Sequence, residues 1–163
     1  MAEMPFEQSL TSGPHRWLNA LVGVWQGTSR IWFGPGNLHD ESPVQGQISP
    51  VLGGRFMRHE YQGSVKGKPQ TGLAIFGISL APGGEQECAW ADSWHMSTGL
   101  LFSKGKPSPD AFNVLGHYAA GTESWGWRTT IAHPAQDLIE IRMFNISPAG
   151  EEDLAVEVDY RRV

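Results

Sequence analysis

The chain has 163 residues, of which 40% are hydrophobic and 18% are charged, and its formal net charge at pH 7 is −5. This length fits one domain, and the composition is too apolar for a disordered chain. The acidic balance argues against nucleic acid as a partner, because a phosphate-binding surface needs an excess of Lys and Arg.

Cysteine content and hydropathy indicate the cellular compartment in which the protein works. Cys88 is the single cysteine, which excludes an internal disulfide and a cysteine-based zinc site. Residues 1–10 contain no apolar run, so no signal peptide is expected, and no segment reaches the ~20 apolar residues of a membrane helix. We therefore expect a cytoplasmic protein with no membrane partner.

Residues 1–12 are expected to form an N-terminal extension, and residues 13–163 one domain. A helix of about two turns is predicted after the extension, with Ser12 as its cap and Pro14 in its first turn. Gly23 ends a run of apolar residues at helical spacing, namely Trp17, Leu18, Leu21 and Val22. A helix this short is not stable alone, so we expect it to cover one end of a larger structure.

The hydrophobic period changes to two at Trp25, directly after Gly23. The glycine allows a tight turn from the helix into the first strand. The Trp25 indole is expected to close one end of a barrel.

About ten strand-like runs follow with short connections and no helix between them. Residues 38–43 are predicted to be a polar loop, and Pro50 indicates an edge or a bulge. Antiparallel neighbours are expected, and so long a sheet usually curls shut, which predicts an all-β, up-and-down antiparallel barrel. The runs are 25–33, 44–52, 55–65, 71–79, 86–94, 100–104, 111–119, 125–133, 138–146 and 154–161.

Three blocks of the sequence resemble a bacterial family of unknown function. They are residues 23–27 (GVWQG), residues 52–56 (LGGRF) running into 59–63 (HEYQG), and residues 90–93 (WADS) with 97–99 (STG). Its members look like calycins, the β-barrels that include lipocalins and fatty-acid-binding proteins. The resemblance covers residues 15–162 and implies a calycin-like barrel with the short helix at one mouth. Calycins generally hold small apolar or amphipathic molecules, so such a ligand is implied by analogy.

A barrel of this size can leave a lumen that binds one small molecule. The less charged face of residues 55–62 carries His59 and Tyr61, which are candidate inward hydrogen-bonding groups, although either could simply belong to the wall. Tyr160, near the end of the last strand, is a candidate for a head-group contact.

The run at 86–95 can point either face inward. One face offers Trp90 and Asp92 together with Cys88 and Trp94, and the other offers His95 among small residues. A buried Asp92 must be paired or have a raised pKa. Alternatively, Asp92 caps the turn that follows.

Trp125 and Trp127 share one face of a later strand, where aromatic rings suit a flat or apolar ligand or pack the core. Arg128 and Arg142 fall on the wetter faces. This is unusual for a fatty-acid carrier, because such barrels turn arginines inward toward a carboxylate.

No metal site or cofactor is expected, because no two histidines stand at i,i+2 or i,i+4. Cys88 has no evident base near it in the sequence, which predicts an inert thiol. Some haem-binding barrels, the nitrobindins, begin with a similar Gly-x-Trp-x-Gly, but their iron ligand is a histidine late in the chain. The last histidine here is His133, so haem is the least favoured of the ligands considered.

The sequence thus favours a non-enzymatic protein that binds a small hydrophobic or amphipathic molecule. The alternative is a small barrel enzyme of the isomerase, cyclase or decarboxylase type, in which His59, Tyr61 and Asp92 act as acid, base or orienting group. The sequence does not identify the ligand, and it is compatible with a homodimer.

Overall fold

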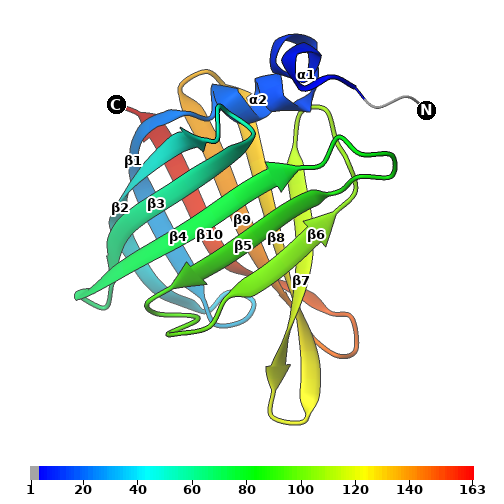
Figure 1. Ribbon diagram of the computed structural model, residues 1–163. Coiled ribbons are helices and arrows are strands. Elements are labelled where there is room, and N and C mark those ends of the chain that lie inside the picture. Colours follow the sequence, from blue (N-terminus) through cyan, green and yellow to red (C-terminus); the bar gives the residue numbers. More distant parts are fainter. Residues whose placement is uncertain (1–3) are drawn as a thin grey trace.

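The computed structural model describes residues 4–163 and shows a closed barrel of ten antiparallel strands (Figure 1). Each strand pairs with its neighbour in sequence, and β1 closes the barrel on β10. The predicted fold class is therefore confirmed. The strands are β1 (Gly23–Trp32), β2 (Leu38–Val51), β3 (Phe56–Val65), β4 (Lys68–Ile78), β5 (Gln86–Asp92), β6 (Leu101–Gly105), β7 (Phe112–Ala120), β8 (Glu123–Ala135), β9 (Leu138–Ile146) and β10 (Glu152–Arg162).

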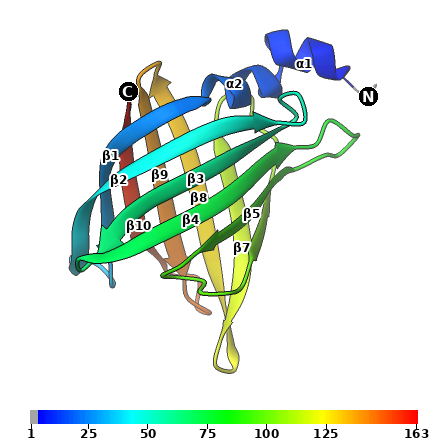
Figure 2. The ribbon, with the colours of Figure 1, turned by 60° about the vertical axis from the view of Figure 1, so that its left-hand side comes forward.

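Two short helices, α1 (Phe6–Ser12) and α2 (Pro14–Ala20), lie across one end of the barrel (Figures 1 and 2). The sequence predicted α2 alone. The additional helix, α1, is held against α2 by tertiary contacts. Ser9 is fully buried with its Oγ 2.9 Å from His15 Nδ1, and the Phe6 ring packs edge-on against His15. Within the described residues no helix is long and apolar enough to cross a membrane.

The predicted cap of α2 was wrong by one residue. Its N-cap is Gly13, which provides no side-chain hydrogen bond, whereas Ser12 ends α1 and donates its hydroxyl to the Gln8 carbonyl. Pro14 occupies the first turn of α2 as predicted.

Trp25 closes the helix-side end of the barrel, as predicted. It is fully buried, and its indole N–H donates to the Leu21 carbonyl at 3.0 Å. The Arg162 guanidinium lies 4.2 Å from the centre of the ring. Gly23 turns the chain into β1 with a φ of 156°, which favours glycine.

The predicted loop at residues 38–43 is instead the first part of β2. Exposed and buried positions alternate without interruption from Glu41 to Ile48, but polar side chains hide this period in the sequence. Ser42 pairs with Ser29 of β1, and its hydroxyl donates to Asp40 at 2.7 Å. Pro50 lies where β2 extends past β1 and pairs only with β3, so it occupies an edge, as expected.

The two ends of the barrel are packed differently. At the end covered by the helices, large side chains fill the interior. Leu18 of α2, Met57 of β3 and Ile139 of β9 have no exposed surface. The loops that join β1 to β2, β3 to β4 and β5 to β6 lie at the opposite end, which we call the mouth (Figure 2). Asp92, described next, is the mouth-end residue of β5, and Tyr160 lies nearer the other end, with its ring 6.4 Å from that of Trp25.

Candidate functional site

A cavity lies between the core and the mouth, with walls from β1 to β5 and β8 to β10. The free volume of the cavity is about 40 Å³, counted at the positions that the centre of a water molecule can occupy, so it has room for ordered water or one small molecule. The interior is narrower than the sequence suggested, because aromatic side chains occupy much of it. Its apolar wall includes Ile31, Val44, Ala74, Phe76, Ile141 and Val158.

Asp92, the last residue of β5, is the centre of a hydrogen-bond network in this cavity. Its Oδ2 accepts from Gln70 Nε2 at 3.0 Å and from the Tyr61 hydroxyl at 3.2 Å, and lies 2.7 Å from His95 Nδ1. Its Oδ1 accepts from the backbone N–H groups of residues 94–96. Burial alone would raise the pKa of Asp92, but these hydrogen bonds and the interaction with His95 hold it below its ordinary value.

Both alternatives for residues 86–95 therefore contain part of the answer. β5 turns Cys88, Trp90 and Asp92 inward, and the turn that Asp92 caps then brings His95 to the same cavity. Trp94 points away from the cavity and is 37% exposed. Burial raises the pKa of the Cys88 thiol to about 12, consistent with the inert thiol predicted.

A second polar pair, His59 and Tyr160, joins opposite parts of the wall. His59 Nε2 lies 3.1 Å from the Tyr160 hydroxyl. Burial lowers the pKa of His59 to about 4 and raises that of Tyr160, so both are uncharged at neutral pH. Gly46 makes space for this pair, because a Cβ there would lie 2.9 Å from His59 Nε2 and overlap the tyrosine hydroxyl.

Tyr61 connects the two groups. Its ring centre lies 5.1 Å from that of His59, and its hydroxyl accepts from the Trp90 indole at 2.9 Å. Burial raises the pKa of Tyr61 well above its ordinary value. Gly72 stands directly across from Tyr61 on β4, where a Cβ would overlap the tyrosine ring. Neither glycine was predicted from the sequence, because only the strand register shows what lies opposite them.

The two predicted tryptophans of β8 lie in different surroundings. Trp127 is buried and stacks on Trp90, with ring centres 5.6 Å apart, and its indole N–H has no hydrogen-bond partner within residues 4–163. Trp125 lies outside the cavity, and its indole N–H donates to Glu123.

Of the eight predicted residues, six line one cavity, Trp127 packs behind them, and Trp125 lies apart. The six are His59, Tyr61, Trp90, Asp92, His95 and Tyr160.

Three aromatic rings that the sequence analysis did not group form a mouth cluster, defined as Phe33, His39 and Trp94. Phe33 stacks on His39 at 4.0 Å between centres and on Trp94 at 6.0 Å. Trp94 also contacts His95 edge-on at 4.5 Å, so the cluster borders the cavity. The cluster thus joins the chain at the β1–β2 connection, Phe33 and His39, to Trp94 in the turn after β5.

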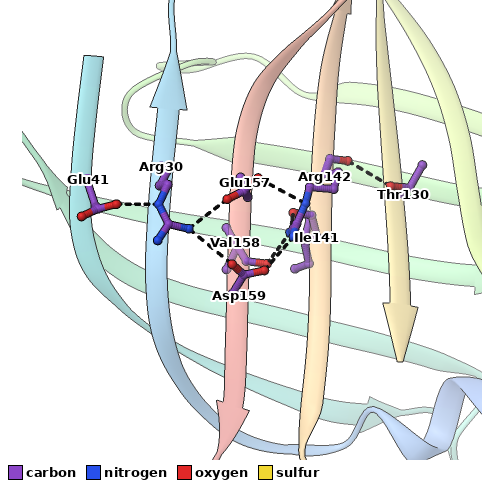
Figure 3. Close-up of polar contacts among 8 residues, drawn as sticks. All are labelled: Arg30, Glu41, Thr130, Ile141, Arg142, Glu157, Val158 and Asp159. Carbon is purple, nitrogen blue, oxygen red and sulfur yellow. Dashed lines mark hydrogen bonds and ion pairs between the residues drawn. The ribbon is translucent and has the colours of Figure 1, made fainter. Parts of the chain in front are cut away.

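The arginines of the neighbouring strands lie outside the barrel (Figure 3). Arg30 of β1 donates to Glu157 at 2.9 Å, and Arg142 of β9 donates to Asp159 at 2.8 Å. Arg128 pairs with Glu152 at 2.7 Å. Arg128 and Arg142 thus occupy the outer faces predicted for them, and across the described chain no Lys or Arg lines the cavity.

Metal-binding geometry is not found in the part of the chain that the structure describes, where no three His, Cys, Asp or Glu side chains converge. His133, the last histidine, lies at the helix-side end, where its ring contacts Trp25 and its Nδ1 lies 2.8 Å from the Leu138 carbonyl. It therefore does not face the cavity.

Residues 11–162 match the family described as a protein of unknown function (DUF1579), which confirms the predicted resemblance to such a family. No curated protein matches the chain. Among solved structures, the S-type phycobiliprotein lyase CPES from Guillardia theta is 12% identical, with 96% of each chain covered and a TM-score of 0.56. This likeness shows the fold alone. A protein of unknown function from the DUF3598 family of Nostoc punctiforme PCC 73102 is 9% identical, with 94% of this chain and 100% of that chain covered and a TM-score of 0.26.

Proposed function

The chain belongs to the DUF1579 family, and we propose that it binds a small hydrophobic or amphipathic molecule inside its barrel. The observation that carries the proposal is a cavity with an apolar wall on which two hydrogen-bonded polar groups converge. Binding pockets for small molecules have this composition. The fold shared with a phycobiliprotein lyase is consistent with ligand binding in a barrel.

The narrow interior limits the size of the ligand. A compact or slender molecule fits between the aromatic rings, and a larger one requires the mouth cluster to move apart. The helix-side end is closed by Trp25, so entry is expected from the mouth.

A pair of matched substitutions tests this proposal. Ala74 faces the cavity between His59 and Trp90, which are its partners on the two adjacent strands, so Ala74→Leu fills the site. Ala91→Leu adds the same atoms to the outer face of β5 and serves as the control. Each protein is purified without detergent, extracted with organic solvent and analysed by mass spectrometry.

We expect the wild type and the control to carry the same molecule in comparable amounts, and Ala74→Leu to carry far less. Recovery of nothing above background from the wild type would contradict the proposal. Equal recovery from Ala74→Leu would place the molecule outside the cavity.

Proton transfer is a second candidate function, favoured by the Asp92–His95 pair. Asp92 bonds Nδ1 of His95, which leaves Nε2 outside this hydrogen bond in a cavity that also holds Tyr61. The sequence left the roles of His59, Tyr61 and Asp92 open; here Asp92 would be the orienting group and His95 the base, while His59 is bonded to Tyr160.

Ring opening of 5-nitrobenzisoxazole, which requires only a base, tests the second candidate. Wild-type protein is expected to exceed free imidazole at the same concentration, and His95→Gln to remove the excess. The exposed His117→Gln is the control. A wild-type rate equal to that of imidazole rejects catalysis and leaves ligand binding intact.

A further inference from the structure

The cavity wall contains the Asp92 carboxylate, paired with His95, and within the described residues no Lys or Arg, although arginines stand on the strands that build it. From this arrangement we propose that the cavity selects uncharged hydrogen-bonding molecules, such as alcohols or carbonyl compounds, and excludes anions. The inference rests on the proposed function and narrows its ligand to one chemical class.

The arginines nearest the cavity stand on the outer side of its wall. Arg30 lies between Ser29 and Ile31, which both line the cavity, and Arg142 lies between Ile141 and Met143, which also do. Side chains alternate between the faces of a strand, so each arginine lies one residue from the wall but on its outer side.

The outer network holds these arginines in place. Arg30 contacts Glu157 and Asp159 on β10, and Arg142 contacts the same two carboxylates from the other side (Figure 3). Bringing either guanidinium inside would require a one-residue slip of its strand, which would also turn the apolar wall outward. An anionic ligand therefore meets neither of these guanidinium groups, and no Lys or Arg of the described chain lines the cavity.

The Asp92 carboxylate also disfavours an anionic ligand. A bound carboxylate or phosphate would be removed from water and placed beside this negative group in a poorly polar cavity, where repulsion is strong. The structure thus disfavours an anion twice, by desolvation and by repulsion.

The site also lacks a strong preference for cations, because its carboxylate is already hydrogen-bonded. Asp92 already receives side-chain hydrogen bonds from Gln70, Tyr61 and His95, and three backbone N–H groups bond its other oxygen. An amine would have to displace one of these donors. The groups that remain for a ligand include the hydroxyls of Ser29, Ser64 and Thr129, His95 Nε2 and the uncharged His59–Tyr160 pair.

Three probes of equal chain length separate the possibilities: 1-hexanol, hexanoate and hexylammonium. Binding is followed at pH 7.5 by shifts of the backbone amide signals of cavity residues in ¹H–¹⁵N NMR titrations. We expect saturable binding of 1-hexanol and binding about 100-fold weaker, or none, for hexanoate. Hexylammonium is expected to bind more weakly than the alcohol.

Two lysine variants test the cause. Ser29→Lys places a cation in the wall, and Thr28→Lys places the same charge on the outer face of β1, across from Asp159. We expect Ser29→Lys to raise hexanoate affinity at least tenfold and Thr28→Lys to leave it unchanged.

The outcomes distinguish the two levels of the argument. Hexanoate binding within tenfold of 1-hexanol in the wild type overturns the charge selection and leaves the binding function standing. An equal response of the two lysine variants also overturns it. If none of the three probes shifts the cavity residues, the proposed function itself fails, and the inference fails with it.

Discussion

Mild acid is expected to destabilise this barrel through His59. In the folded protein burial lowers the pKa of His59 from 6.5 to about 4. Between these two values the unfolded chain binds a proton that the folded chain does not, so the free energy of unfolding falls as the pH falls. A difference of 2.5 pK units, from 6.5 − 4, corresponds to about 3 kcal/mol lost across this window.

The surroundings of His59 explain why the folded state resists protonation. The ring packs against Tyr61 and Phe76, and its Nε2 is bonded to the Tyr160 hydroxyl, so none of these neighbours carries a negative charge at neutral pH. An imidazolium in this position would be desolvated without a counter-ion.

Urea unfolding, followed by tryptophan fluorescence between pH 7.5 and 4.5, measures the effect. His59→Gln retains a hydrogen-bonding group near the position of Nε2 but does not titrate, so its stability should depend less on pH than that of the wild type. His117→Gln removes an exposed histidine and serves as the control. Buried His15, whose pKa is also lowered, contributes to all three proteins equally. An identical pH dependence of His59→Gln and the wild type would refute the reasoning.

Three further substitutions test other parts of the structure. Gly72→Ala should cost about 1–3 kcal/mol in urea unfolding, because the new methyl overlaps the Tyr61 ring. Trp94→Ala should speed exchange of bound 1-hexanol several-fold in NMR line-shape measurements, because it opens the mouth cluster. Arg30→Met should cost less than about 1 kcal/mol, with a cost that shrinks at high salt, and leave 1-hexanol affinity unchanged, because this arginine belongs to a partly exposed outer network.

Matched variants make the first two results interpretable. A Cβ on Gly99 would meet its nearest neighbours only at 3.7 Å or more, so Gly99→Ala should be neutral. Trp125→Ala removes an indole away from the mouth cluster and should leave exchange unchanged. An equal cost for both glycine variants, or equal acceleration by both tryptophan variants, would contradict the roles assigned to Gly72 and Trp94.

The wall of the barrel could be predicted because its signal is local. Alternation of period two identified the inward faces of β3 and β10, including Met57, His59 and Tyr160. The same signal failed at residues 38–43, where Ser42 occupies an inward position and looks like part of a polar loop. Alternation also places Leu154 on the face of Val156 and Tyr160, but a register shift between Leu154 and Val156 interrupts the period there. At such positions the type of amino acid does not indicate whether the side chain points into the barrel or out of it.

The composition of the site could be predicted only in part, because part of it depends on contacts between strands. His59 and Tyr61 follow from one strand. Gly46 and Gly72, which both pair with Tyr61, make space for these side chains, and that depends on the register of β2 and β4 against β3. His95 reaches the cavity because the chain turns after Asp92, and strict alternation would have placed these two on opposite faces.

The same architecture separates stability from binding along the barrel axis. In the helix-side half, fully buried apolar residues such as Leu18 and Met57 hold the sheet closed, and Trp25 seals the end. Toward the mouth, Tyr61, Gln70 and His95 converge on Asp92 beside the cavity. Truncation of Met57 should therefore lower the free energy of unfolding without changing which probe binds. A charge introduced at Ser29 should instead change which of the probes binds best. If both substitutions altered ligand choice, the two halves would be one coupled unit, and the assignment of binding to the mouth side would lose its basis.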